Sequence, residues 1–279
     1  MMNPAATNGQ AQTVLRFEDV SLAFDENVAL DRVSFEQHAG ETLIVLGAAG
    51  SGKTALLKTA VGLLRPDSGR VWLLGEEITN RNERDLFRLR SSVGVLFQEG
   101  GLFDSLTVGE NVAYPLENQQ VGPTASPEEI EHRVLDALSF VELEHTVDKF
   151  PGELSGGMRR RVGIARASVT EPPLVLYDSP TAGLDPITAN TIVALIAKER
   201  DMHDTANLMV THRYQDAEIM ARFRYNPDSG QLAPVSDDSR NNGLRTVFMV
   251  MEGGRLVFEG SQKELEASND PYVARFVRH

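Results

Sequence analysis

The chain contains the octapeptide Gly47-Ala48-Ala49-Gly50-Ser51-Gly52-Lys53-Thr54, which matches the phosphate-binding loop pattern without a mismatch. The apolar residues 42–46 before it predict a buried strand, and residues 55–61 after it predict a helix. Glycines let such a loop wrap around a phosphate and point its N–H groups inward at the start of a helix. Lys53 is then expected to reach the β- and γ-phosphates, and the Thr54 hydroxyl to ligate Mg²⁺. This setting favours a nucleoside triphosphate site over a plain glycine-rich turn.

Length and composition limit what the chain can do. Its 279 residues allow one large α/β domain or two modest ones, and 41% hydrophobic with 24% charged residues is typical of a globular protein with a core. The net charge of −13 argues against a nucleic-acid partner, because phosphate contacts need clustered Lys and Arg. The absence of cysteine excludes disulfides and thiolate chemistry. No apolar run approaches a membrane span and no apolar signal region is present, so we expect a cytoplasmic protein.

The N-terminal part of the chain is predicted to form an antiparallel β subdomain. Residues 1–12 are small and polar, and we expect a disordered tail there. Alternating patterns predict three strands before the phosphate loop, with a turn after the second, at residues 14–20, 21–24 and 32–37. Phe24 ends the second strand. Its ring can stack on an adenine or belong to the core, and the pattern alone leaves both interpretations open.

The middle of the chain changes character after a buried strand at residues 93–97, which ends at Gln98. Residues 99–165 are mostly helical and more polar, and we interpret them as a helical subdomain inserted into the α/β core. One predicted helix begins at Ser126 and carries an apolar stripe of Ile130, Val134, Leu135, Leu138 and Val141.

The sequence Leu154-Ser155-Gly156-Gly157-Met158 predicts a second anion-binding helix end. Ser155 is a favourable N-cap, and the two glycines leave the first backbone N–H groups of the helix accessible. The three arginines that follow, residues 159–161, are expected on a solvated helix face. One chain would therefore carry two separate sites for a phosphate group.

Two further strands end in side chains that suit a nucleotide site. Residues 174–178 form an apolar strand ending in Asp178, which can hold the Mg²⁺ shell. A strand-terminal Asp can also simply cap a turn, but the phosphate loop favours the metal role. Residues 208–210 form another core strand, followed by Thr211 and His212. His212 is expected at the same edge as Asp178, within reach of a γ-phosphate.

Together these motifs resemble those of the ATP-binding-cassette (ABC) ATPases, over nearly all of residues 14–279. They occur in the order of that family: residues 47–54, Gln98, 154–158, Asp178, 182–185 and His212. The resemblance implies an α/β fold, with a P-loop NTPase (ABC ATPase) core, an antiparallel β subdomain and an inserted helical subdomain. It implies a single domain over residues 13–279, with ATP and Mg²⁺ as ligands.

The resemblance also implies roles for individual residues. Phe24 would stack on the adenine, Gln98 would contact Mg²⁺ and the attacking water, and His212 would hold the γ-phosphate. The segment Ser155-Gly156-Gly157 would bind the γ-phosphate of ATP held by an opposing protomer, because the family works as head-to-tail dimers with two ATPs at the interface. Asp185 would belong to the loop that links the two sites.

One stretch of the sequence resembles a particular subgroup of the ABC ATPases. Residues 95–112, which include Leu102-Phe103-Asp104-Ser105-Leu106-Thr107-Val108, are similar to the Mla/Mkl-type ATPases, which drive phospholipid or other lipid transport. Met158 and the arginines at 160–161 also favour this similarity. This similarity implies a homodimer, or a pair with another ABC ATPase, on the inner face of the cell membrane. It would be held there by an MlaE-like permease, with an MCE-type substrate-binding protein in the same system and no nucleic acid.

One residue departs from the family pattern. The family usually has Glu after the strand-terminal Asp, as the base for the attacking water, and this chain has Ser179. A serine hydroxyl can position a water but cannot take its proton at neutral pH. The loss of a general base costs ~10²–10⁴-fold in rate. Tight ATP binding with slow turnover is therefore predicted.

Two functions from different classes are consistent with these features. The chain is either the ATPase subunit of a lipid transporter or an ATP-gated regulatory nucleotide-binding module with little ATPase activity. A soluble cassette of DNA repair or translation is less favoured, because such proteins usually carry tandem cassettes or large insertions. The segment 224–245 is longer than the hairpin usual in the family, and it suggests no role beyond a partner contact or a surface loop.

Overall fold

The computed structural model describes four stretches of the chain, residues 12–98, 100–118, 125–235 and 245–277. The predicted disordered tail, apart from Gln12, lies outside the described residues. No helix among the described residues is long and apolar enough to cross a membrane.

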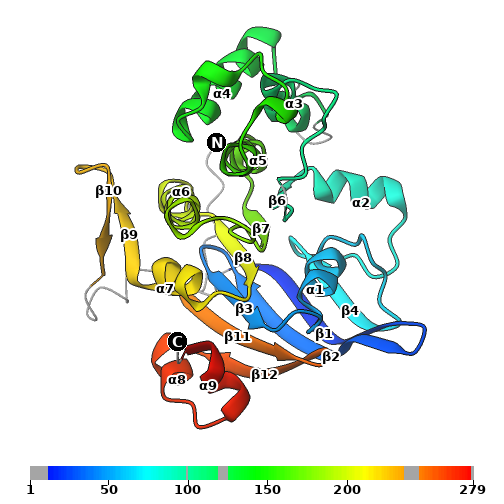
Figure 1. The fold of residues 1–279 in the computed structure, drawn as a ribbon. Helices are drawn as coiled ribbons and strands as arrows, with labels where there is room; N and C mark the ends of the chain where they lie inside the picture. The colour runs from blue at the N-terminus through cyan, green and yellow to red at the C-terminus, as the bar shows by residue number, and fades with distance from the viewer. Residues whose placement is uncertain (1–11, 99, 119–124, 236–244, 278–279) are drawn as a thin grey trace, which may run out of the picture.

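The centre of the molecule is a six-stranded sheet in the order β12-β11-β3-β8-β7-β6 (Figure 1). Its strands are β3 (Thr42–Gly47), β6 (Val93–Leu96), β7 (Leu174–Asp178), β8 (Ala206–Thr211), β11 (Thr246–Glu252) and β12 (Arg255–Gly260). Every pairing is parallel except that of β12 with β11. The carboxyl ends of the five parallel strands therefore meet at one edge of the sheet.

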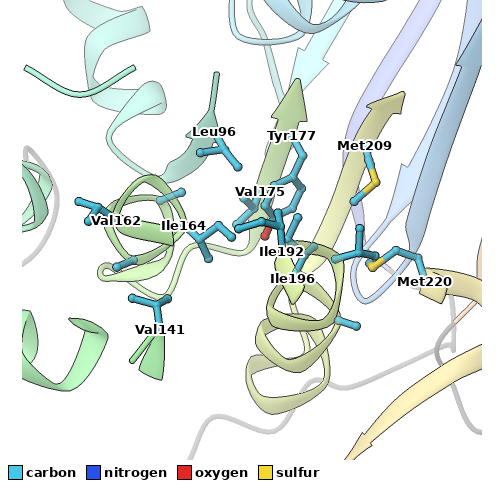
Figure 2. Packing of buried hydrophobic residues seen from close by; sticks show 14 of the residues in the cluster. Leu96, Val141, Val162, Ile164, Val175, Tyr177, Ile192, Ile196, Met209 and Met220 are labelled. Carbon is cyan, nitrogen blue, oxygen red and sulfur yellow. The ribbon is translucent and has the colours of Figure 1, made fainter. Parts of the chain in front are cut away.

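The central strands are buried on both faces, which explains their continuous apolar runs. On one face, side chains pack against helices α5 (Gly156–Ser168), α6 (Pro186–His203) and α7 (Tyr214–Arg222). Figure 2 shows Val175 and Tyr177 of β7 beside Ile192 and Ile196 of α6. The alternate residues of the same strands pack on the other face against α1 (Lys53–Ala60), α2 (Glu83–Arg90) and a second sheet.

The second sheet is antiparallel, as predicted, and has the order β2-β1-β4-β5. It consists of β1 (Thr13–Phe24), β2 (Asn27–His38), β4 (Ser68–Leu73) and β5 (Glu76–Glu77). The prediction of separate strands at 14–20 and 21–24 is wrong, because β1 is continuous. The register of β1 against β2 shifts between Phe17 and Val20, and Asp19 adopts a φ of 50° there. Such a bulge breaks the alternation in the sequence without ending the strand.

The helices after Gln98 are α3 (Val108–Glu117), α4 (Pro127–Phe140) and α5, with two short 3₁₀ turns between α4 and α5, at Glu144–Thr146 and Pro151–Glu153. Figure 1 shows α3 and α4 at the opposite end of the molecule from the C-terminal helices. Ser126 caps α4 by accepting from the Glu129 N–H at 3.2 Å. The predicted stripe on α4 is right for Val134 and Leu138 and wrong for Leu135, which is exposed.

The last part of the chain returns to the central sheet. Residues 223–234 form a hairpin of β9 (Phe223–Asn226) and β10 (Gln231–Pro234), so the first part of the unusual segment 224–245 is ordered as a two-stranded sheet. Residues 236–244 of that segment lie outside the described residues. After β11 and β12, the chain ends in α8 (Gln262–Glu266) and α9 (Pro271–Val277).

We expect one buried carboxyl to make the stability of the fold pH-dependent. Glu199 of α6 is buried and accepts from the hydroxyls of Tyr177, at 3.4 Å, and Thr205, at 3.3 Å. Burial raises the pKa of Glu199 to about 7. Between pH 4.5 and 7 the unfolded chain releases this proton and the folded chain keeps it. The free energy of unfolding should therefore fall by about 3 kcal/mol across that interval.

Urea denaturation at pH 5 and pH 8 measures this effect. In Glu199→Gln this part of the pH dependence should be absent, whereas Glu131→Gln, an exposed change on α4, should leave it in place. An equal pH dependence in the parent and in Glu199→Gln would contradict the assignment.

Candidate functional site

A cleft of about 1130 Å³ opens at the carboxyl edge of the central sheet. The residues that line it come from the β1–β2 hairpin, the phosphate loop, the ends of β6, β7 and β8, the start of α7, and α9. Many of the predicted site residues line it, namely Phe24, Ala48, Ala49, Gly50, Gly52, Lys53, Thr54, Gln98, Ser179 and His212. Segments far apart in the sequence are thus brought together by the parallel order of the strands.

The phosphate loop is held by two glycines for which no other residue fits. Gly52, the N-cap of α1, has a φ of 105°, and a Cβ there would lie 2.2 Å from the Ala29 carbonyl oxygen. A Cβ on Gly47 would lie 2.7 Å from the Met251 carbonyl oxygen. The loop is therefore packed directly against the backbones of β2 and β11. No side chain caps α1, so its first N–H groups remain available to an anion.

Lys53 is directed into the loop. Its ammonium donates to the carbonyl oxygens of Gly47, at 2.8 Å, and Ala48, at 2.7 Å, and the side chain is only 8% exposed. Burial lowers the pKa of Lys53, and the charge of Asp178 opposes that effect. The ammonium is thus a cation at the loop whose charged form is stabilised by a carboxylate at the end of β7.

Phe24 does not belong to the core. The ring is 48% exposed at the end of β1 and lines the cleft beside Asn27 and Val28 of β2. The structure thus removes the core alternative and leaves an exposed aromatic face at the mouth of the cleft. Such a face can stack on a base.

The residues expected to hold Mg²⁺ supply only oxygen ligands. Asp178 ends β7 and is 6% exposed, whereas Thr54 and Gln98 line the cleft. Hydroxyl, amide and carboxylate oxygens suit a hard cation that takes its remaining ligands from phosphate and water. The described residues contain no cluster of three His, Cys, Asp or Glu side chains that would hold a metal by themselves. The set therefore fits Mg²⁺ that arrives with a nucleotide.

Ser179 occupies the position next to Asp178. It adopts a φ of 48°, and its hydroxyl donates to the Asp178 carboxylate at 3.2 Å. Among the described residues that line the cleft, none is Asp or Glu. The site therefore contains no described carboxylate in place of the usual base.

His212 follows β8 and is exposed in the cleft, on a loop fixed by a buried carboxylate that the sequence did not reveal. Asp216, in the first turn of α7, accepts hydrogen bonds from the hydroxyls of Thr181 and, at 3.1 Å, Thr211. The Arg213 guanidinium lies 3.5 Å from it. Burial raises the pKa of Asp216, and its hydrogen bond to Thr181 opposes this. Asp216 thus joins the loop after β7 to the loop that carries His212.

The second predicted anion site lies apart from this cleft. Ser155 caps α5 by accepting from the Met158 N–H at 3.2 Å, as expected. Neither the segment Ser155-Gly156-Gly157 nor Asp185 lines the cleft. Asp185 instead caps α6, accepting from the N–H groups of Ile187, at 3.1 Å, and Thr188, at 3.0 Å. The two helix ends predicted to bind phosphate therefore lie at separate places on the chain.

The prediction of a solvated arginine face on α5 is wrong. Arg160 is buried, and its guanidinium donates to the Ala182 carbonyl oxygen. Arg159 donates to the Leu154 carbonyl at 2.8 Å, and Arg161 donates to that of Val141 at 3.0 Å. These side chains satisfy backbone carbonyls around α5, a use that charge periodicity along one helix cannot reveal.

A sequence model described as ABC transporter matches residues 30–182, more than half of the chain. The chain belongs to the ABC transporter family. A methionine import ATP-binding protein MetN from Rhodopseudomonas palustris is 40% identical over 276 residues, which cover 99% of this chain and 67% of that protein. The probable ribonucleotide transport ATP-binding protein mkl of Mycobacterium leprae is 36% identical over 263 residues, 94% of this chain and 68% of that protein. MetN of Carboxydothermus hydrogenoformans is 42% identical over 184 residues, which cover 66% of this chain and 53% of that protein. The chain therefore spans about half to two thirds of the length of these relatives.

Solved ABC cassettes have the same fold. The ATP-binding cassette MJ0796, a dimer in a post-hydrolysis state bound to ADP and Pi, gives a TM-score of 0.74 at 27% identity, over 89% of this chain and 98% of that chain. Clostridium perfringens cbiO1, part of the ABC transporter complex cbiONQ, gives a TM-score of 0.74 at 28% identity. The match covers 95% of this chain and 94% of that chain. The predicted ABC ATPase fold is confirmed. The ABC family binds ATP with Mg²⁺, the two ligands that the sequence predicted.

We expect Asp216→Ala to destabilise this ABC cassette by about 3 kcal/mol, because two buried hydroxyls would lose their acceptor and the Arg213 guanidinium would lose its ion pair. Glu218→Ala, on the same helix but in a partly exposed pair with Arg222, should change the free energy of unfolding by less than about 0.5 kcal/mol. Urea denaturation of both variants measures the difference. Equal effects would show that Asp216 does not join the two loops.

Proposed function

We propose that the chain is the ATP-binding and ATP-hydrolysing subunit of an ABC transporter. The observation that carries this proposal is the convergence of the phosphate loop, Gln98, Ser179 and His212 on one cleft, with Asp178 behind it. Membership of the ABC transporter family supports ATP as the nucleotide.

The proposed roles follow from the positions of the side chains. Phe24 stacks on the adenine, and the N–H groups of the loop from Gly47 to Thr54 hold the phosphates together with Lys53. Thr54, Gln98 and Asp178 provide ligands for Mg²⁺, which when bound would offset the negative charge of the phosphates. His212 donates to the γ-phosphate. Ser179 can orient a water by hydrogen bonding, but its hydroxyl has no capacity to take a proton from that water at neutral pH.

We propose that two copies pair head to tail, so that the segment Ser155-Gly156-Gly157 of one closes over the ATP of the other. Several observations support this. The N-terminus of α5 carries glycines, and a Cβ on Gly157 would lie 2.7 Å from the Thr188 methyl of the neighbouring helix α6. Ile187, beside Thr188, is 81% exposed, which is unusual for a large apolar residue. MJ0796, which has the same fold, was solved as a dimer.

A capping serine tests the dimer. Ser155→Arg should abolish ATP-dependent dimerisation, measured by light scattering with ATP and Mg²⁺, while the monomer still binds ATP through its own loop. Ser126→Arg removes the matching cap of α4, at a similar cost of about 1 kcal/mol, and should still dimerise. ATP-dependent dimers of the Ser155 variant would contradict the head-to-tail arrangement.

Ser179 leads us to propose slow hydrolysis in the isolated protein. The Ser179→Glu change should raise the steady-state rate ~10²–10⁴-fold, because it restores a general base. The affinity for ATP should stay nearly the same. In Ser179→Gln the new side chain has nearly the shape of Glu but cannot act as a base, so hydrolysis should remain slow. A parent enzyme that turns over at tens per second would contradict this proposal.

We propose that a permease docks beside the loop that follows β6. Phe97, Phe103 and Tyr114 are exposed there, and the rings of Phe103 and Tyr114 lie 4.8 Å apart. The part of this loop from Phe103 to Thr107 has a fixed shape because the buried Asn111 amide donates to the carbonyl oxygens of Phe103, at 3.1 Å, and Thr107, at 2.9 Å. A rigid aromatic surface next to Gln98 suits contact with a helix end of a membrane subunit.

For the cargo we propose a lipid, carried with an MlaE-like permease and an MCE-type protein, which would hold the chain at the inner face of the membrane. The support is the stretch from Leu102 to Val108, which forms part of this surface. The relatives are named for other cargoes, methionine in one case and ribonucleotides in the other. Co-purification with a co-expressed MlaE-like permease, followed by a lipid-transfer assay with and without ATP, tests the lipid proposal.

The second candidate is an ATP-gated regulatory module, and Ser179 is the observation that favours it. Steady-state ATPase assays of the chain with and without its permease separate the two. Stimulation of hydrolysis by the permease supports a transport ATPase. Dimerisation on ATP with no hydrolysis in the complex supports the module.

A further inference from the structure

The C-terminal helix α9 forms part of the nucleotide cleft. The Tyr272 hydroxyl donates to the Met251 carbonyl oxygen, at 2.9 Å, and lies 3.5 Å from the Ala48 nitrogen as a long acceptor for its N–H. Ala48 is the second residue of the phosphate loop. Arg275 and Phe276 line the cleft together with Lys53 and His212. A segment near the end of the chain therefore supplies part of the wall beside this loop.

The neighbouring helix α8 anchors this wall. Figure 1 shows α8 and α9 next to each other at the C-terminal end of the molecule. Glu266 of α8 accepts from the hydroxyl of Tyr214, at 2.6 Å, and from the guanidinium of Arg222, at 2.8 Å. Tyr214 begins α7, two residues after His212. The helix pair is thus attached both to the loop that carries His212 and to the phosphate loop.

Arg275 is the cation that this arrangement presents. The side chain is exposed, and its guanidinium carbon lies 3.8 Å from the centre of the Tyr272 ring and 5.1 Å from that of Phe276. Contact with the Tyr272 ring, and the nearby Phe276 ring, restrains the guanidinium while its N–H donors can still reach a ligand. No described carboxylate forms an ion pair with Arg275 within 4.0 Å. The donors are therefore available to a ligand in the cleft.

The chemistry of the cleft indicates what that ligand is. The described lining residues include Lys53, Arg213 and Arg275 but no Asp or Glu. A planar guanidinium pairs with two oxygens of one phosphate group. A polyanion on the loop beside Tyr272 would lie close to a long side chain whose guanidinium contacts the same ring.

We propose that Arg275 is a nucleotide-binding residue that contacts the terminal phosphates of the triphosphate, and that Tyr272 is a positioning residue that holds Arg275 beside the phosphate loop. This proposal rests on the ATP site of the proposed function. The chain thereby supplies a cation to its own nucleotide from its last helix, in addition to Lys53.

Equilibrium titration of the full chain with a fluorescent ATP analogue and Mg²⁺, with ATP and ADP as competitors, tests Arg275. Arg275→Ala should weaken ATP binding roughly 5- to 50-fold, as expected for the loss of a charge-assisted contact, and ADP binding by less. Arg275→Lys should be intermediate, because it keeps the charge without the two-pronged geometry. Arg84→Ala, an exposed arginine of α2 outside the cleft, makes the same change in net charge and should bind as the parent does.

An Arg275→Ala affinity for ATP within twofold of the parent would overturn the proposal, as would equal losses for ATP and ADP. Lys53→Ala distinguishes this failure from that of the proposed function. If Lys53→Ala still binds ATP normally, the ATP site itself is wrong. If it loses binding while Arg275→Ala does not, only the role of Arg275 is wrong.

Tyr272→Phe keeps the ring under Arg275 and removes the hydroxyl. The readout is the increase in unfolding temperature caused by saturating ATP. A positioning role predicts a smaller increase in Tyr272→Phe than in the parent, whatever the midpoint without nucleotide. A purely structural hydroxyl would lower both midpoints equally and leave the increase unchanged, and that result would overturn the role of Tyr272.

Discussion

The parallel pairing of β3 with β8, of β8 with β7 and of β7 with β6 is the constraint on which the site depends. Each strand must deliver its carboxyl end to the same edge, so the phosphate loop, Gln98, Asp178 and His212 meet there although they are distant in sequence. The register has no freedom, because both faces of these strands are buried. A one-residue slip of β7 would exchange the faces of Leu176 and Tyr177 and would move Asp178 away from Lys53.

The sequence predicted the elements whose signal is local. The strands of the central sheet appear as continuous apolar runs, the loop from Gly47 to Thr54 as a glycine pattern, and the start of α5 as a capping Ser155. Predictions failed where the deciding contact is long-range. The bulge near Asp19 joins two predicted strands into β1 because β2 supplies its register. Arg160 is buried because the Ala182 carbonyl, 22 residues away, needs a donor.

The same reason explains which site residues were missed. Asp216 has an ordinary place in the sequence of an amphipathic helix, and only the fold brings Thr181 and Thr211 to its carboxylate. Tyr272 and Arg275 lie in a short segment with no motif, and only the fold brings the Tyr272 hydroxyl to Ala48 and Arg275 to the cleft. The roles of the predicted residues themselves stay predictions, although the fold brings many of them to one cleft.

The charges around this cleft favour nucleotide binding more than hydrolysis. The described lining carries cationic groups and no carboxylate. Asp178, at the end of β7, accepts the Ser179 hydroxyl and opposes the effect of burial on the pKa of Lys53. A field of that sign stabilises a bound polyphosphate, and none of the described lining residues is a carboxylate that could deprotonate a water. In the proposed head-to-tail dimer, closure comes from outside the strand edge, because the segment Ser155-Gly156-Gly157 lies apart from the cleft of its own chain. Under that proposal the closed site combines the sheet edge, α9 of the same chain and a second copy. The first two are present before a dimer forms, so a cation from α9 would act on nucleotide capture, and the second copy would act on closure and hydrolysis after capture.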